Sequence, residues 1–308
     1  MGRLAAMVAT VLGVAMAVFL VLTVLPGDAA RLIVGAEAQP ERYFFVRQAL
    51  RLDEPWPVRF WHWLSQALHG DLGKSLRYQD RSVSEILRRG LAITFPLASG
   101  VAILAFLLGT ILGTTAARDV GGPVDLLIST VSQAFLAVPE FWLGIALILL
   151  FSVALGLLPA GGFPGWKEAQ ALHHLLLPAL ALLLPRVAYF SRLSRAVMVE
   201  ALFSEAVRTA RAKGLSERRV VFVHALRQAI LPLLAGLSLT LGRLFAGALV
   251  VEQVFALPGL GRYAVEAAFG RDVPLLLGIA VSVTAVVVAT NFLADLAYGL
   301  LDPRIRSV

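Results

Sequence analysis

Six apolar stretches alternate with polar intervals along the chain. A membrane-spanning helix needs about 20 predominantly apolar residues. The stretches that meet this length are residues 4–25, 91–117, 125–155, 172–190, 225–250 and 274–301. The pattern predicts an all-α membrane protein with six transmembrane helices. We expect the first stretch to be retained as a helix, because it is longer than the apolar region of about 7 to 15 residues in a secretory signal peptide.

Composition supports this class of protein and excludes others. Of the 308 residues, 58% are hydrophobic and 15% are charged, and the mean hydropathy is +0.81. Such a chain is neither intrinsically disordered nor fibrous. The sequence contains no cysteine, which excludes disulfides, thiolate metal sites and cysteine nucleophiles. The net charge of +7 is typical of basic cytoplasmic loops, so we expect membrane lipid and no nucleic acid as a partner.

The positions of Lys and Arg in the short loops predict the orientation. If the N-terminus is inside, the short outside loops hold only Lys167, Arg262 and Arg271. The inside segments then hold Arg3, Arg118, Arg192, Arg195, Arg208, Arg211, Lys213, Arg218, Arg219, Arg304 and Arg306. Arg88 and Arg89 contradict the rule, but the other loops agree. The sequence therefore predicts that both termini are cytoplasmic.

The long interval after the first helix divides the chain. We expect residues 1–90 to form a transmembrane helix with an extracytoplasmic segment, and residues 91–302 to form a core domain with five transmembrane helices. Trp56, Trp61 and Trp63 lie in the extracytoplasmic segment. They are either anchors at the membrane interface or a docking surface for a soluble partner.

Motifs for nucleotide, metal and acyl chemistry are incomplete. Gly73-Lys74-Ser75 resembles the end of a P-loop, but Leu68 occupies the position of the required first glycine. The sequence holds neither an HExxH helix nor a GxSxG elbow. His173 and His174 are adjacent, so on a helix they point in different directions. We expect no catalytic residue, no metal site and no cofactor in this chain.

The interval after the fourth stretch predicts a short, complete helix at about residues 204–213. Ser204 is suited to cap its start, and Glu205 suits the positive end of the helix dipole. Arg211 and Lys213 suit the negative end, and Gly214 can adopt the left-handed conformation that stops a helix. Ala206, Thr209 and Ala210 would give this helix a face of small residues.

The same interval resembles a known family. Val207-Arg-Thr-Ala-Arg-Ala-Lys-Gly-Leu215, followed by His224-Ala-Leu-Arg-Gln-Ala-Ile-Leu-Pro232, is similar to the coupling region of ATP-binding-cassette (ABC) importer permeases of the dipeptide, oligopeptide and nickel branch. Further blocks of the family occur in order across nearly the whole chain. They begin at Leu25, Leu52, Gly70, Pro139, Leu176, Val251, Arg271 and Asp302.

This resemblance implies the type I ABC importer permease fold in a bacterial inner membrane. It implies a second related permease subunit, two ATPase subunits that hold ATP and Mg²⁺, and an extracytoplasmic binding protein. The coupling helix would contact the ATPase through Glu205, Arg208, Thr209, Ala210, Arg211, Ala212, Lys213 and Gly214. Glu252, Pro258, Gly259 and Gly261 would belong to an extracytoplasmic gate region.

Charged residues within membrane spans are costly and are therefore functional candidates. They are Glu140, Arg186, Arg243 and Asp295. Glu140 lies about 15 residues into the third stretch, or ~22 Å along a helix, near the middle of the membrane. It either forms a structural ion pair with an arginine or contacts the translocation path. Gly109 and Gly113 have the spacing that brings two helices close together.

The resulting prediction is the non-enzymatic permease subunit of an importer for dipeptides or oligopeptides. Nickel chelates and glutathione remain alternative substrates, because no residue in the sequence identifies the ligand. A self-sufficient secondary transporter is an alternative of another class, but the internal repeats and midplane polar clusters typical of that class are not evident.

Overall fold

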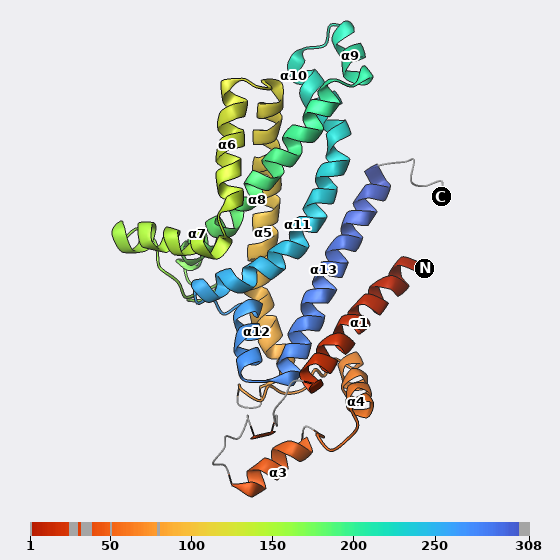
Figure 1. Cartoon of the computed structure of the whole chain (residues 1–308), viewed down its shortest axis with the longest axis vertical. Helices are drawn as coiled ribbons and strands as arrows, with labels where there is room; N and C mark the ends of the chain where they lie inside the picture. Colours follow the sequence, from red (N-terminus) through yellow and green to blue (C-terminus); the bar gives the residue numbers. More distant parts are fainter. Residues whose placement is uncertain (1, 25–29, 32–38, 50, 79–80, 302–308) are drawn as a thin grey trace. The chain divides into compact units, whose positions relative to one another are not determined.

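The computed structural model describes residues 2–24, 30–31, 39–49, 51–78 and 81–301, and this part is almost entirely helical (Figure 1). The helices before residue 120 are α1 Gly2–Val24, α3 Pro40–Ala49, α4 Trp56–Leu68 and α5 Val83–Arg118. The middle of the chain forms α6 Pro123–Ala137, α7 Glu140–Leu147, a π-helical segment Ile148–Ala154 and α8 Ala171–Leu202. The last part forms α9 Glu205–Ala212, α10 Glu217–Arg219, a second π-helical segment Val220–Ala225, α11 Leu226–Val254, α12 Leu260–Phe269 and α13 Val273–Leu301.

Five helical segments of the described chain are long and apolar enough to cross a membrane, and the bent pair of α6 and α7 makes a sixth if it forms one span. Two compact units contain them. One unit comprises residues 1–94 and 258–288, and the other comprises residues 95–257 and 289–308. The predicted division after residue 90 lies near the first boundary, but residues 258–288 pack with the N-terminal segment instead of the rest of the predicted core domain.

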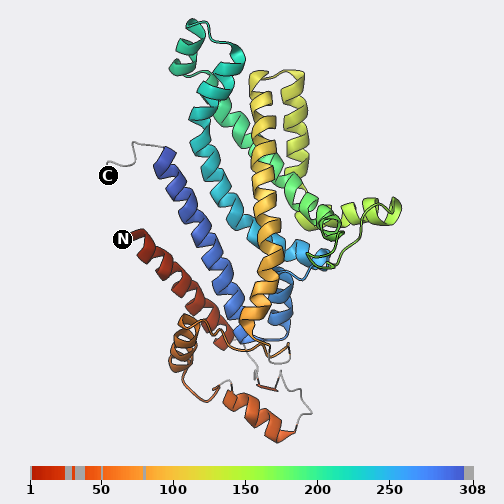
Figure 2. The same ribbon diagram turned by 180° about the vertical axis from the view of Figure 1, so that it is seen from behind.

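The first unit packs the end of α1 and the start of α13 against α4, as the view from behind shows (Figure 2). Phe19 of α1, Phe60 of α4 and Leu277 of α13 are buried together. A second core joins Val83 and Leu87 of α5 to buried leucines of α12 and α13. Burial of apolar surface therefore fixes α4 against two helices of spanning length.

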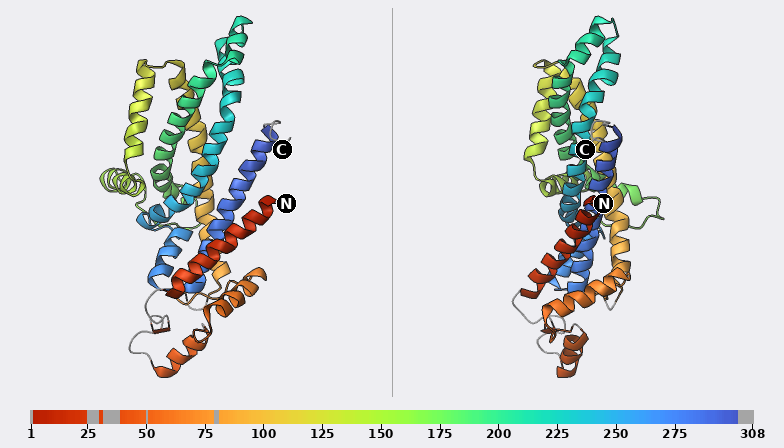
Figure 3. Two further views of the ribbon diagram at one scale, coloured as in Figure 1. Left: turned by 45° about the vertical axis from the view of Figure 1, so that its right-hand side comes forward. Right: turned by 90° about the vertical axis from the view of Figure 1, so that its right-hand side faces the viewer.

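The second unit is organised around α8, which packs against α6, α7 and α11. Two further views show α8 and α11 extending together to the end that carries α9 (Figure 3). Gly109 and Gly113 of α5 lie against α8 as predicted. A Cβ atom at Gly109 would lie 2.8 Å from the carbonyl oxygen of Val187, and one at Gly113 would lie 2.6 Å from the Cβ of Ser194. The missing side chains allow the two helix backbones to approach closely.

Three of the predicted helices are longer in the structure. The second begins at Val83 instead of 91, the fourth continues to Leu202 instead of 190, and the fifth is a continuous segment over Glu217–Val254 instead of 225–250. Pro232 lies inside α11. Apolar content marks only the part of a helix that lies within the bilayer. The length of a helix that continues into water with charged residues is therefore underestimated.

The third predicted span is broken. Residues 125–155 were expected to form one continuous helix, but α6 ends at Ala137 and α7 begins at Glu140, with an angle of 99° between them. Val138 is extended, with φ −91° and ψ 125°, as is favoured before a proline. Pro139 is also extended, with φ −62° and ψ 140°. These two successive non-helical residues separate α6 from α7, whereas the interior prolines of α5, α8 and α11 lie inside continuous helices.

Candidate functional site

The helix α9 has the ends that the sequence predicted. Ser204 precedes it with φ −67° and ψ 151°, and its Oγ accepts a hydrogen bond of 3.5 Å from the backbone N–H of Val207. Glu205 lies in the first turn and Arg211 in the last. Gly214 follows the helix with φ +76°, a conformation that residues with a side chain rarely adopt. The prediction of a capped helix at about 204–213 is confirmed.

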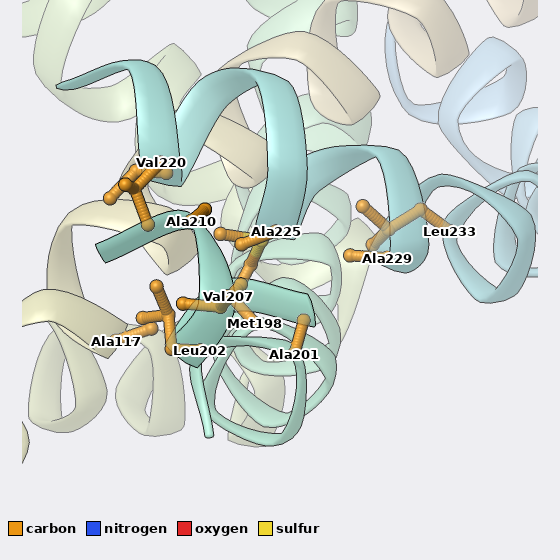
Figure 4. Close-up of a cluster of buried hydrophobic side chains, with 11 residues drawn as sticks. Ala117, Met198, Ala201, Leu202, Val207, Ala210, Val220, Ala225, Ala229 and Leu233 are labelled. Carbon is orange, nitrogen blue, oxygen red and sulfur yellow. The ribbon is translucent and has the colours of Figure 1, made fainter. Parts of the chain in front are cut away.

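One face of α9 is buried against its own chain (Figure 4). Val207 and Ala210 pack in a cluster with Leu202, Val220 and Val221. The hydroxyl of Ser204 also accepts a hydrogen bond of 3.1 Å from the side chain of Gln228. The helix is therefore held firmly at the end of α8 and α11.

Two of the predicted coupling residues make contacts within their own chain. Ala206, Thr209 and Ala210 were expected to form a face of small residues, and Ala210 is buried in this cluster within its own chain. Arg211 donates from Nη2 to Glu217 over 2.6 Å and from Nη1 to the carbonyl of Leu202 over 3.3 Å. The hydrogen bond with Glu217 raises the pKa of Arg211 above its usual value. Arg211 therefore connects α8, α9 and α10 within the chain.

The remaining predicted residues form the exposed side of α9 and its exit. They are Glu205, Arg208, Thr209, Ala212, Lys213 and Gly214. Glu205 and Arg208 form an ion pair of 3.6 Å that is open to solvent. Phe203, which the sequence analysis did not single out, is also exposed directly before the helix. Arg218, Arg219, Phe222 and Val223 line a shallow groove after it, together with Ser216. The end of this unit thus presents charged and apolar side chains together.

A polar pair lies at the bend between α6 and α7. Glu140 is the first residue of α7, and its Oε1 accepts a hydrogen bond of 2.5 Å from Nη2 of Arg186 on α8. Their side chains are 20% and 16% exposed. Gly247 of α11 lies beside the pair, since a Cβ atom there would be 3.6 Å from the same Nη2. In the described part of the chain, Nε of Arg186 is buried without a hydrogen-bond partner.

The other two charged residues predicted within spans are placed differently. Arg243 is exposed on α11, so Glu140 is paired with Arg186 instead. Asp295 belongs to α13, but its side chain lies outside the described residues.

A second polar pair joins α6 to α8, and the sequence analysis missed it. Asp125 accepts hydrogen bonds from Nε and Nη2 of Arg195, the latter over 2.6 Å. It also accepts from the backbone N–H of Gly121 over 2.8 Å and from Ser129 over 3.1 Å. Arg195 was expected in a loop beyond the fourth helix, whereas it lies within α8. The sequence did offer one indication of this pair, since Asp125 is an acidic residue at the start of the third apolar stretch.

The residues predicted for a gate fall in different units. Glu252 lies within α11 in the second unit and is fully buried. Pro258, Gly259 and Gly261 belong to the first unit. There Gly259 precedes α12, and the backbone N–H of Leu260 donates to the hydroxyl of Thr94 over 2.9 Å. The interval 251–274 contains the helix α12.

The segment that resembled a P-loop has a structural contact instead. The hydroxyl of Ser75 donates to Oδ2 of Asp272 over 2.5 Å, and the same carboxylate caps the start of α13 by accepting from Leu275 over 3.2 Å. Nearby, the hydroxyl of Tyr78 donates to the carboxylate of Glu266 on α12. These bonds fasten residues 73–78 to the connection between α12 and α13.

The cluster around Glu266 has shifted pKa values. Burial raises the pKa of Tyr78 above its usual value, and its hydrogen bond to Glu266 adds to the increase. Burial alone would raise the pKa of Glu266, but the hydrogen bonds from Tyr78 and Arg262 outweigh it and lower that pKa.

The histidine pair does not resemble a metal site. Nδ1 of His174 lies 3.1 Å and 3.0 Å from the carbonyl oxygens of Gly161 and Gly162, so it is the protonated donor to one or both. Among the described residues, no group of three His, Cys, Asp or Glu side chains converges.

Comparison with known proteins shows the family to which the chain belongs. Residues 109–307 match the binding-protein-dependent transport system inner membrane component family, and residues 1–97 match its N-terminal region. The chain belongs to this family of ABC importer permeases. It is 38% identical to the glutathione transport system permease protein GsiC of Salmonella typhimurium, over 99% of this chain and 97% of that one. It is 35% identical to the oligopeptide transport system permease protein AppB of Bacillus subtilis, over 96% and 95% of the two chains.

A solved structure shares the fold. One chain of an inward-facing structure of the MetNI methionine ABC transporter is similar in fold to this protein, with a TM-score of 0.60 and 17% sequence identity. The match covers 71% of this permease and 97% of that chain. It confirms the predicted type I importer permease fold. Family membership also decides against the self-sufficient secondary transporter.

Proposed function

We propose that this permease translocates dipeptides or oligopeptides delivered by an extracytoplasmic binding protein. Relatives along nearly its full length are named for peptide and oligopeptide transport. Glutathione, itself a small peptide, is the second candidate, because a relative at 38% identity is named for it. We place the chain in a bacterial plasma membrane, with both termini cytoplasmic and with a second related permease beside it.

Two ATPase subunits supply the energy in this proposal, and α9 is the element that they contact. The observation that supports this role is the division of α9 into two sides. Val207 and Ala210 hold the helix to its own chain, while Glu205, Arg208, Thr209, Ala212 and Lys213 remain accessible. A firmly seated helix with an open outer side can transmit movement of a partner to α8 and α11.

The other sequence-predicted residues keep the roles proposed for them. Residues 1–90 supply the first transmembrane helix and the extracytoplasmic segment, and residues 91–302 supply the core. Glu252, Pro258, Gly259 and Gly261 belong to the gate region, and Glu140 and Arg186 support the membrane part. ATP and Mg²⁺ are held by the ATPase subunits, since the sequence holds no complete P-loop.

Gly214→Val in the complete importer tests the role of α9. A Cβ atom at Gly214 would meet no atom of the described residues within 4 Å, so valine acts through its unfavourable φ of +76°. We expect less substrate transported per ATP hydrolysed. Gly156→Val is the matched control, because Gly156 is also exposed, has φ +62° and has open space at its Cβ position. Equal transport per ATP in the Gly214 and Gly156 variants contradicts the coupling role of this exit.

Purification in mild detergent tests the wider proposal. Mass spectrometry should identify ATPase subunits, a second permease and a binding protein with bound peptide or glutathione. A lone chain that transports substrate down an ion gradient contradicts it.

A further inference from the structure

The helix α4 carries an apolar side that no other part of the described chain covers. Its inner side is accounted for, because Phe60 is buried and Trp63 and Leu64 are half-buried against α1 and α13. Outside that contact, Trp61 is 70% exposed and Leu68 is 78% exposed. Trp61 also lines a shallow groove of about 500 Å³ together with Pro57, Val58, His62 and Ser65.

The contacts of α4 fix its depth relative to the spanning helices. Phe60 meets Phe19 with ring centroids 5.3 Å apart, and it shares a core with Leu277. Phe19 lies five residues before the end of α1 at Val24, and Leu277 lies four residues after the start of α13 at Val273. At 1.5 Å per residue, these anchors are about 8 Å and 6 Å from the helix ends. With the ends of α1 and α13 taken as the membrane surface, α4 lies within the depth of about 5–10 Å at which interfacial helices are buried.

The sequence of α4 divides its surface into three strips. At 100° per residue, Trp61 and Leu68 lie within about 20° of each other, whereas Gln66 and Arg59 lie about 140° and 160° from Trp61. The inner strip containing Phe60 lies between these two sides. Arg59 is half-buried, and its guanidinium carbon lies 5.6 Å from the ring centroid of Phe19. A long cationic side chain at this depth can extend its charge to the headgroups.

We propose that α4 is an interfacial helix whose Trp61–Leu68 side is inserted among the phospholipids of the leaflet in which α1 ends. Its inner strip holds it to α1 and α13, and the side that carries the exposed Gln66 faces water and headgroups. Tryptophan is enriched at this level of the membrane because its ring is apolar and its N–H is polar. A lipid occupant also explains why the exposed tryptophan side lies opposite the polar strip at this depth. The inference depends on the spans α1 and α13 and not on the substrate or the ATPase contact.

The cysteine-free sequence allows a direct test. Single substitutions Trp61→Cys and Leu68→Cys probe the proposed lipid side, Gln66→Cys is the control on the polar side, and His62→Cys lies between the two sides. Each variant of the complete importer is spin-labelled and placed in nanodiscs of phosphatidylethanolamine and phosphatidylglycerol. Accessibility is measured to oxygen, which concentrates in acyl chains, and to a water-soluble nickel chelate.

We expect the ratio of oxygen to chelate accessibility to be severalfold higher at 61 and 68 than at 66, with an intermediate value at 62. Leu68→Cys keeps every tryptophan, so it remains informative if Trp61→Cys does not fold. High chelate accessibility at all four positions would overturn the proposal in favour of a water-exposed helix. Labels at 61 and 68 that are accessible to the chelate until the binding protein is added, and protected afterwards, would overturn it in favour of protein docking.

Discussion

The two arms of the broken third span are attached to the same helix in different ways. The α6 arm is fixed to α8 by Asp125 and Arg195, and the side chain of Asp125 is only 3% exposed. Two arginine nitrogens, one backbone N–H and one hydroxyl donate to that carboxylate. The α7 arm is fixed by Glu140 and Arg186, with one hydrogen bond and with Nε of the arginine unpaired in the described structure. The comparison indicates that the α6 arm is rigidly attached to α8. At the α7 arm, Nε of Arg186 remains able to form a further hydrogen bond if the contacts of this arm change.

Arg195→Met is expected to have the largest effect on stability. The substitution leaves the buried carboxylate of Asp125 without its cationic partner, and breaking a buried ion pair costs about 3–5 kcal/mol. We expect the lower end of this range, because Asp125 keeps its bonds to Gly121 and Ser129. Thermal unfolding of the purified importer in detergent provides the measurement.

Arg192→Met is the matched control for that experiment. Arg192 also connects α8 to α6, through a 2.7 Å hydrogen bond to Gln133, but it is exposed and its partner is neutral. The free energy of unfolding should change by no more than about 0.5 kcal/mol. Similar losses in both variants would contradict the assignment of the rigid attachment to Asp125.

Glu140→Gln should reduce transport more than it reduces stability. Glutamine keeps an oxygen that can accept from Arg186 but removes the negative charge, so we expect a loss of about 1 kcal/mol in the free energy of unfolding. Uptake by reconstituted importer, divided by its ATP hydrolysis, should fall. Unchanged uptake together with unchanged assembly would contradict both a structural and a transport role for the pair.

The Tyr78–Glu266 cluster of the first unit lies outside the membrane spans and can be compared with the two ion pairs through its effect on the pH dependence of stability. Folding lowers the pKa of Glu266. Its contribution to the free energy of unfolding is therefore complete above its ordinary pKa of 4.5, and it is lost as the pH falls through the lower pKa of the folded state. Folding raises the pKa of Tyr78. Its contribution to the free energy of unfolding is therefore complete below its ordinary pKa of 10.0, and it is lost as the pH rises through the higher pKa of the folded state. Glu266→Gln should flatten the acid side of a plot of unfolding temperature against pH. An unaltered acid side would show that Glu266 is not responsible.

The smallest effect is expected at the solvent-exposed pair of Glu205 and Arg208. Arg208→Gln should change the free energy of unfolding by only about 0.3 kcal/mol, since exposed ion pairs contribute little. A fall in ATPase stimulation with unchanged unfolding temperature would place Arg208 at the partner contact. A large fall in unfolding temperature would instead show that the pair has a structural role.

The sequence was sufficient for α9 because the determinants of that helix are local. Ser204 and Gly214 act on backbone within a few residues, and their conformations follow from their side chains. The pairing of Glu140 could not be predicted, because Arg186 and Arg243 are equally plausible partners until the folding of distant segments is known. The break at Pro139 was also missed, since Pro96, Pro178, Pro185 and Pro232 all lie inside continuous helices. What distinguishes Pro139 is tertiary packing on α8 and α11.

The bend at Pro139 also has a consequence for biosynthesis. The α6 arm has 15 residues, and α7 and the π-helical segment after it have 8 and 7. Neither arm alone reaches the length of about 20 residues that a spanning helix needs. Both arms emerge from the ribosome before α8, which carries Arg186 and Arg195. During synthesis, Asp125 and Glu140 are therefore made before the arginines that pair with them, so neither ion pair can form until α8 has been synthesised.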